Sequence, residues 1–481
     1  MGTRTENLGA PARTLSDVYK TLSPKPLIRP EDLDAFYRDI NNVRGGGVIG
    51  QMALSLGRAS QAGFYKAFLM GHPGSGKSTE LSQLIRQVKQ QYQAIRLSAT
   101  DQLDPANLKP FDILLLTMVR VAEETAKPVA DGGAGQPVNE QRLKEIWDWF
   151  AEERRATQTA NTIMGTASAG VGIKGGSFWA SVLGLFGELT GEMKHATERR
   201  IEVVEYRLQR VSALIEMANR LLDDCNAQLQ DATQKEWLLV WEDFDKPGFP
   251  KGRVEELFLT YAHLFKALRT HLIFTIPIVL GYSSQSRNLP VPTEQRLVIP
   301  DVPVYHRDHS PHQEGREAIR SILEARVAPN LFADNAMTRL IVASGGNLRD
   351  LFSLVAKAAD DAILRNPGTN PPDLRTDLRI ERENVSRAIT WLRGEYEKHL
   401  GTGPLDEENL NYEQKAARML DIYRGKKTAA VPDPCLYTLL RAQAVQGFNG
   451  ERWLGIHPLV VDILKKQGMF PEGEGALGGT E

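Results

Sequence analysis

The chain has 481 residues, which is more than one ordinary hydrophobic core can organise, and the length predicts about three domains. Its 42% hydrophobic and 25% charged residues are typical of a soluble globular protein, and no apolar run approaches the roughly 20 residues needed to span a bilayer. The formal charge is only −2, which excludes a global electrostatic field that would attract nucleic acid.

The first residues and the cysteines indicate the cellular compartment in which the protein works. Residues 1–17 have no apolar h-region, so they do not predict a secretory signal. Cys225 and Cys435 lie far apart and lack the paired spacing of a metal site. We therefore expect a cytoplasmic protein without disulfides or a zinc site.

The N-terminal part predicts an arm followed by a strand, a glycine-rich turn and a helix. Residues 1–62 include Pro24, Pro26, Pro30 and a glycine cluster and are expected to form an arm ahead of the core. The apolar run at 65–70 predicts a buried strand, and apolar residues at i, i+3, i+4 and i+7 over 81–88 predict a helix. Strand, glycine-rich turn and helix therefore follow one another directly.

The middle of the chain interrupts this pattern. A strand is predicted at 94–99 and helices at 111–121 and 140–150, but residues 157–192 are dominated by Gly, Ala, Ser and Thr. This segment belongs to a helical insertion at about 157–230; we interpret its glycine-rich part as a hairpin or loop, with a membrane or partner contact as the alternative. A heptad seam over 201–225 requires a partner helix, either 140–157 of the same chain or a second copy.

Alternation of strands and helices then resumes and predicts a parallel sheet. Buried strands are expected at 237–241 and 271–276, an amphipathic helix at 253–268 between them, and an edge strand within 297–304. The predicted fold class is thus α/β, with a core at 63–308.

Helical regions complete the predicted organisation. Residues 309–400 predict a helical lid, and residues 405–470 predict two helices, a hairpin around 449–450 and a final helix. The tail at 471–481 is expected to be disordered.

The strongest chemical signal is the phosphate-binding loop (P-loop) at residues 71–78. It matches G-x-x-x-x-G-K-[ST] at every fixed position, and a predicted strand precedes it while a helix follows. Backbone N–H groups of such a loop cradle phosphates, Lys77 reaches the β and γ oxygens, and Ser78 ligates Mg²⁺. ATP and Mg²⁺ are the predicted cofactors, and the predicted cofactor-binding residues are Gly71, His72, Pro73, Gly74, Ser75, Gly76, Lys77, Ser78 and Thr79.

A second signal is the acidic end of the strand at 237–241, typical of a Walker B element. Glu242 is expected to support the metal together with Ser78, and Asp243 is the candidate base. The order Glu-Asp departs from the commoner Asp-Glu, and the acids at 242, 243 and 245 cannot be ranked without geometry.

These residues reveal a family resemblance. The run from Glu242 to Lys246 resembles the acid-acid-apolar-acid-basic ending found in STAND-type signalling ATPases of the AAA+ group. The resemblance implies a sensor 1 role for Thr275 and a sensor 2 role for Arg349 in Gly345-Gly346-Asn347-Leu348-Arg349. It also implies that residues 405–470 form a winged-helix domain, whereas the insertion has no counterpart in that group. A trans arginine finger is expected by analogy, with Arg287 and Arg296 as the candidates.

Two weaker features have structural alternatives. Tyr37, Arg38 and Arg44 precede the P-loop where related ATPases contact adenine, yet such a cluster also suits an ordinary docked helix. The C-terminal region carries basic residues that suit phosphate contacts, although packing against the nucleotide domain is the preferred interpretation. These basic residues are Arg424, Lys426, Lys427, Arg441 and Arg452.

The sequence therefore predicts an ATP-hydrolysing molecular switch of the AAA+/STAND type. By resemblance, it would couple nucleotide state to assembly or to an effector protein, in bacterial signalling or defence against phage. Two alternatives remain: a DNA-associated AAA+ ATPase of the initiator or transposition-regulator kind, and a non-hydrolysing nucleotide-bound scaffold.

Overall fold

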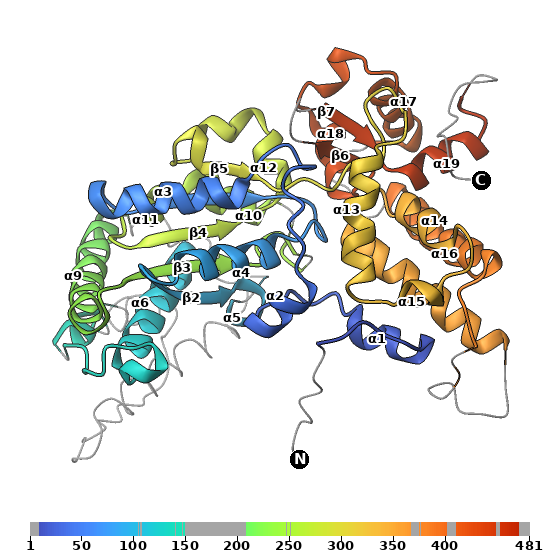
Figure 1. Cartoon of the computed structure of the whole chain (residues 1–481). Coiled ribbons are helices and arrows are strands. Elements are labelled where there is room, and N and C mark those ends of the chain that lie inside the picture. The colour runs from blue at the N-terminus through green and yellow to red at the C-terminus, as the bar shows by residue number, and fades with distance from the viewer. Residues whose placement is uncertain are drawn as a thin grey trace, which may run out of the picture.

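The structure is a computed structural model that describes residues 9–103, 105, 108–139, 141–146, 148–149, 208–246, 248–250, 252–366, 375, 377–401, 410–448 and 453–470. An α/β domain lies beside a helical region that leads into a C-terminal group of helices and a hairpin (Figure 1). The glycine-rich segment at 157–192, Arg452 and the tail from residue 471 lie outside the described residues.

A five-stranded sheet forms the centre of the α/β domain. Each neighbouring pair of strands is parallel, and the order is β2-β3-β4-β1-β5. The predicted α/β class and parallel sheet are therefore confirmed, and β5 is the predicted edge strand. The strand bounds are Lys66–Met70 for β1, Tyr92–Ser98 for β2, Glu236–Glu242 for β3, His271–Thr275 for β4 and Arg296–Val298 for β5.

Helices cover both faces of this sheet, which explains why its strands are continuously apolar. In β3, Leu238 and Val240 enter the core on one face, whereas Trp237, Leu239 and Trp241 enter the core on the other. The first face carries α3 (Val48–Ala62) and α4 (Lys77–Val88). The second carries α6 (Pro110–Ala126), α9 (Leu208–Thr233), α10 (Arg253–Thr260) and α11 (Ala262–Ala267).

The structure divides the expected N-terminal arm differently. Helix α3 belongs to the α/β core, because Ile49, Met52 and Leu56 are buried together with Leu81 and Leu84 of α4. Residues nearer the N-terminus instead pack on the lid, where Ala12 pairs with Val327 through a parallel bridge. The sequence does not show this division. The segment is rich in proline and glycine, and the apolar side chains of α3 meet their packing partners only in the folded chain. The short helices of this region are η1 (Leu15–Asp17), α1 (Val18–Thr21) and α2 (Pro30–Phe36).

The described part of the heptad seam packs within the chain. Its residues Ala218, Leu222 and Cys225 are buried, with Leu214 and Leu221 of the same helix α9, in the same core as α6 and the described residues of 141–149. Ion pairs join Arg142 to Asp224 at 3.2 Å and Arg220 to Glu145 at 3.2 Å. The described part of the seam thus has its intramolecular partner, whereas residues 150–207 lie outside the described range.

The lid and the residues after it share one hydrophobic core. The lid contains α13 (Gln313–Glu324), α14 (Ala336–Ala343), α15 (Leu348–Arg365) and α16 (Arg382–Leu400). We call residues 410–470 the C-terminal module; it contains α17 (Tyr412–Tyr423), α18 (Pro434–Arg441), the antiparallel strands β6 (Val445–Phe448) and β7 (Trp453–Ile456), and α19 (Pro458–Lys466). Its helices and hairpin follow the predicted order, and the winged-helix name stays an interpretation. No described helix is both long and apolar enough to cross a bilayer.

Helix α3 offers a matched test of its place in the core. Leu56 is fully buried, whereas Leu54 on the same helix is 55% exposed. Leu56→Ala should lower the free energy of unfolding by about 2–5 kcal/mol, since it removes buried methyl groups and leaves a cavity. Leu54→Ala should change it by about 0.5 kcal/mol or less. Equal effects of the two substitutions on urea unfolding, followed by circular dichroism, would show that α3 is not part of the core.

Candidate functional site

The P-loop connects β1 to α4 in a conformation that glycine makes accessible. Gly74 and Gly76 have φ values of +93° and +97°, in the left-handed region that residues with a Cβ rarely adopt. A Cβ at Gly74 would also collide with Asn347 and Arg349. The loop is therefore both tightly turned and closely covered.

The loop has the features of an anion cradle. The N–H groups of Lys77 and Ser78 have no backbone acceptor among the described residues and lie at the positive end of the α4 dipole, whereas those of Thr79 and Glu80 donate to the Gly76 carbonyl at 3.0 Å. Among the described residues, the Ser75 hydroxyl and both ring nitrogens of His72 are buried without a hydrogen-bond partner. Burial lowers the pKa of His72, so its ring is neutral. This set of donors fits a nucleotide phosphate chain.

Lys77 is held inside the loop. Its ammonium donates to the carbonyl oxygens of Gly71 and His72 at 2.8 and 2.9 Å, and it pairs with Asp245 at 2.8 Å. Only 6% of its side chain is exposed. Asp245 thus provides the negative charge that a phosphate group would otherwise supply.

A cavity of about 170 Å³ extends from the P-loop to the lid. One end has the P-loop residues together with Asp243, Asp245 and Arg349, so phosphate-binding groups meet there. Arg349 lies in the first turn of α15, and its guanidinium makes no hydrogen bond or ion pair within the described part of the chain. Both the predicted base and the predicted sensor 2 arginine therefore line the same cavity as Lys77.

The acidic loop after β3 is fixed by its neighbours. Asp243 has a φ of +75°, a strained conformation for a non-glycine residue. Its N–H donates to Thr275 Oγ1 at 2.9 Å, and its carboxylate accepts from Ser98 Oγ at 2.8 Å. Because β4 lies between β1 and β3, Thr275 is placed between the P-loop and the acids, where it also donates to Asp245 at 3.4 Å. Thr275 is thus placed to orient the acids.

The acids at 242, 243 and 245 have different surroundings. Glu242 is absent from the described lining of the cavity, because its carboxylate accepts a 2.6 Å hydrogen bond from Arg96 Nε and is neutralised by that guanidinium. Asp243 and Asp245 line the cavity instead. This geometry does not favour the metal-ligand role predicted for Glu242, which stays a prediction.

The Gly-Gly-Asn-Leu-Arg segment lies directly on the P-loop. Asn347 Nδ2 donates to the Pro73 carbonyl at 2.9 Å and to Asp301 Oδ1 at 3.1 Å, while the Leu348 N–H donates to the Gly74 carbonyl at 3.2 Å. Asn347 Oδ1 accepts from the N–H groups of Arg349 and Asp350, so it caps α15. Helix α15 of the lid therefore begins directly at the phosphate-binding loop.

The C-terminal module reaches the same place. Gln443 Nε2 donates to the Pro73 carbonyl at 3.2 Å, and Gln446 Nε2 donates to Asp301 at 2.8 Å and to the Gly345 carbonyl at 3.0 Å. These contacts support the preferred interpretation that the module packs against the nucleotide domain. No pattern in the sequence identifies either glutamine.

The rest of the described cavity lining combines apolar and aromatic side chains with arginines. Tyr37, Arg38 and Arg44 all line it, and Arg44 is buried, donating to the Ser75 carbonyl at 2.8 Å. Arg326 lies between the rings of Phe36 and Phe352, 5.2 and 5.1 Å from their centroids. Sequence reasoning missed Arg326 because nothing local distinguishes it from a surface arginine.

The two arginine-finger candidates differ in their surroundings. Arg296 donates to the backbone carbonyls of Ser286, Leu289 and Val291, so it holds the preceding loop. Arg287 is exposed in η6 (Ser284–Asn288) and has no hydrogen bond or ion pair to any described residue. Arg287 stays a candidate finger on these grounds.

A buried polar cluster joins the lid to the C-terminal module beside this site. Tyr396 Oη donates to Asp350 at 2.7 Å, the His457 ring stacks on Tyr396 at 4.3 Å, and His457 Nε2 donates to the Ser344 carbonyl at 3.0 Å. Burial raises the pKa of Asp350 to about 6 and lowers the pKa of His457 to about 3. The histidine is therefore neutral throughout the range in which Asp350 titrates.

The raised pKa of Asp350 predicts a pH-dependent stability. Between its ordinary pKa of 3.8 and about 6, only the folded state keeps the proton, so this group's stabilising contribution is complete below 3.8 and is lost as pH rises through 6. Asp350→Asn removes the titrating group and should therefore remove this loss of stability. The difference in unfolding free energy, variant minus wild type, should increase by roughly 3 kcal/mol from about pH 4 to pH 7.

Urea unfolding of both proteins at the two pH values measures this difference. Asp360→Asn is the matched control, since Asp360 is an exposed carboxylate on the same helix. A stability difference for Asp350→Asn that is the same at both pH values would contradict the titration of Asp350.

Comparisons with known proteins add little. No protein-family model matches the sequence, and no curated protein matches it. A Walker-type ATPase of Pyrococcus abyssi is a solved structure similar to this chain, with 14% identity and a TM-score of 0.38. The match covers 92% of this chain and 99% of that one.

Proposed function

We propose that the chain is a magnesium-dependent ATPase that works as a molecular switch. ATP bound between the core and the lid would stabilise one conformation or assembly, and hydrolysis would return the chain to the other. Nucleotide binding can shift such an equilibrium only if it changes contacts that differ between the two states.

The observation that carries this proposal is that both the lid and the C-terminal module contact the P-loop. The Pro73 carbonyl accepts hydrogen bonds from Asn347 of the lid and from Gln443 of the C-terminal module. Any movement of the loop around phosphates would change both contacts together. The nucleotide site and the two C-terminal regions would therefore respond as one unit.

The chemistry proposed for the site uses groups already close together. Lys77 would exchange its Asp245 partner for the phosphate oxygens, and Arg349 would approach the same charge from the lid. Mg²⁺ would be held by Ser78 with the neighbouring acids and would neutralise charge developing during phosphoryl transfer. Asp243, with its geometry fixed by Ser98 and Thr275, would accept a proton from water.

The finer role follows from the resemblance to STAND-type AAA+ ATPases. We propose that the switch controls an effector protein or the assembly of further copies of the chain, in bacterial signalling or defence against phage. The exposed Arg287 would serve as the trans finger if copies assemble.

ATP turnover in variants tests the proposed hydrolysis. Lys77→Ala should reduce turnover at least about a hundredfold, because it removes the cation that contacts the transferred phosphate. Asp243→Asn should retain nucleotide binding and lose turnover by a similar factor. Lys89→Gln, which changes an exposed cation on the same α4 segment, should behave as wild type.

Recording particle mass with ADP and with ATP tests the switch in the same samples. An ATP-dependent change of mass, absent in Lys77→Ala, is expected for a switch that acts by assembly. If ADP remains bound without exchange and ATP alters neither turnover nor mass, the non-hydrolysing scaffold becomes the better account.

The DNA-associated alternative has specific counter-observations. Arg441 at the end of α18 pairs with Glu255 of the core at 2.9 Å, and the Ser284 N–H donates to Tyr437 Oη at 3.4 Å. Helix α18, which carries Arg441 and Tyr437, is therefore docked on the ATPase core.

A salt titration of DNA binding separates this alternative from the switch. We expect Arg441→Gln and Lys426→Gln to leave any weak affinity for duplex DNA unchanged, because Arg441 pairs with Glu255 and Lys426 pairs with Asp421. Fluorescence anisotropy with a labelled duplex measures it. Salt-dependent binding that both substitutions abolish would favour the DNA-associated reading.

A further inference from the structure

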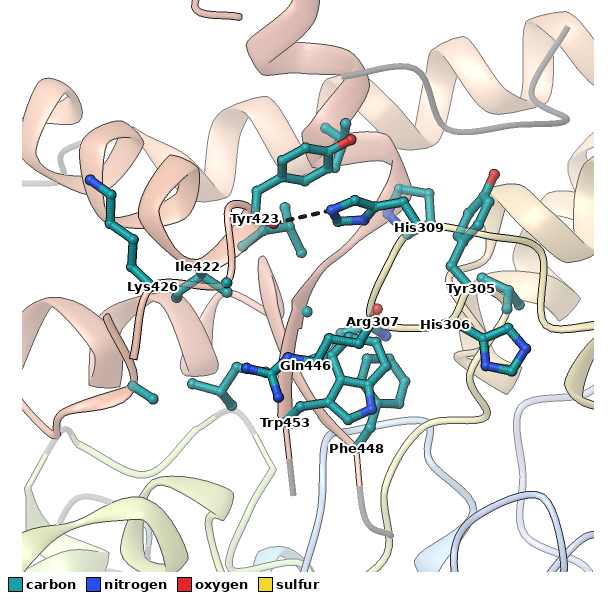
Figure 2. A pocket seen from close by; sticks show the side chains of 18 of the residues that line it. Tyr305, His306, Arg307, His309, Ile422, Tyr423, Lys426, Gln446, Phe448 and Trp453 are labelled. Carbon is teal, nitrogen blue, oxygen red and sulfur yellow. Dashed lines mark hydrogen bonds between the residues drawn. The ribbon is translucent and has the colours of Figure 1, made fainter. Parts of the chain in front are cut away.

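A second cavity, of about 200 Å³, lies where the C-terminal module meets the loop that leads from β5 into α13. Its wall includes residues 304–307 and His309, the end of α17 and the following turn, and strands β6 and β7 (Figure 2). It shares no lining residue with the cavity at the P-loop. None of the residues proposed for ATP hydrolysis lines it.

The described lining of this cavity is electropositive. It contains Arg307, Lys426 and Lys427 and no carboxylate, although the whole chain carries a formal charge of −2. Lys426 pairs with Asp421 at 2.5 Å, outside the lining. Arg307 and Lys427 make no hydrogen bond or ion pair with any described residue, and both are exposed. Two cations are thus available at the mouth for a ligand.

Aromatic pairs form two sides of the same cavity. The His309 and Tyr423 rings stack at 4.0 Å with 10° between their planes, and His309 Nε2 donates to the Tyr423 carbonyl at 3.1 Å. The Phe448 and Trp453 rings stack at 4.5 Å with 28° between their planes. Figure 2 shows these pairs on opposite sides, with Arg307 beside Trp453.

The aromatic wall is fixed by the local backbone. A Cβ at Gly455 would lie only 2.7 Å from the Trp453 ring and 3.0 Å from the Phe448 ring, so glycine permits both rings to lie over the strand. His309 has a φ of +67°, an uncommon conformation for a residue with a side chain. Gln446, in the same wall, is held by Asp301 and the Gly345 carbonyl. The ring-bearing wall is therefore preorganised.

We propose that this cavity binds a small ligand in which a heteroaromatic ring carries a phosphate group, of the class of nucleoside monophosphates. The ring would enter between the aromatic pairs, since heteroaromatic bases stack on such side chains. The phosphate would remain at the mouth, where the fork of Arg307 and the ammonium of Lys427 match its oxygens. The volume lies below the roughly 300–1,000 Å³ of drug-sized sites, which favours one ring system over a dinucleotide.

Isothermal titration calorimetry on the full chain tests the proposal. The protein is first saturated with ADP and Mg²⁺, so that the P-loop site does not contribute. AMP, GMP, CMP and UMP are then titrated separately, alongside inorganic phosphate and the corresponding nucleosides. At least one monophosphate should bind with micromolar affinity, and its nucleoside and phosphate alone should each bind at least about tenfold more weakly, since each lacks one set of contacts.

Substitutions locate that binding. Arg307→Gln should weaken it at least about tenfold because it removes a charge-assisted contact, and it should fold normally since Arg307 is exposed and unpaired in the described structure. Trp453→Leu should weaken it similarly through lost stacking. Lys89→Gln, a change of an exposed cation outside both cavities, is the matched control and should bind as wild type.

Three results would overturn the proposal. The first is that no monophosphate binds more tightly than inorganic phosphate. The second is binding that Arg307→Gln and Trp453→Leu leave unchanged. The third is binding that appears only when ADP is omitted, because the monophosphate would then occupy the P-loop. Each result is independent of whether the chain hydrolyses ATP.

Discussion

The side chain of Asn347 connects the phosphate-binding loop to most of the C-terminal half of the molecule. Its two N–H groups donate to the Pro73 carbonyl and to Asp301, and its oxygen accepts from the first turn of α15. An asparagine amide has two donors and one acceptor oxygen, so every group is used. The residue is 1% exposed, and losing any partner would leave a buried polar group unsatisfied. The position of the lid is therefore tied to the conformation of the P-loop.

Two kinds of contact hold the C-terminal module in place. It shares an apolar core with the lid, and separating the two would cost free energy because buried apolar surface would be exposed to water. Towards the nucleotide domain, the described contacts include individual polar bonds from Gln443, Arg441 and Tyr437. Such bonds contribute about 0.5–1.5 kcal/mol each, which nucleotide binding can offset. The same apolar core also contains Ile278 and Val279 of the α/β domain, so the polar bonds are the contacts that a movement of the P-loop would change first.

The sequence predicts the parts of this molecule whose partners lie nearby in the chain. The P-loop, the buried strands and the helix starts depend on local spacing, and the structure contains them at the predicted places. The surroundings of the acids depend instead on residues far away in the sequence. Arg96 of β2 pairs with Glu242 and neutralises it, and Lys77 pairs with Asp245. Gln443 and Arg326 reach the site only because the lid and C-terminal module fold back on it, so no local pattern could predict them.

Hydrogen exchange measured by mass spectrometry over α18 and β6 tests the central claim most directly, because it reports the docking of the module for these segments of the chain. Wild-type chain would be compared with ADP and with a non-hydrolysable ATP analogue, each with Mg²⁺. The account predicts that exchange around Gln443 and Gln446 is slow with ADP and becomes clearly faster with the ATP analogue. The same protection in both states, with nucleotide bound in each, would contradict a switch that acts through the P-loop and the C-terminal module.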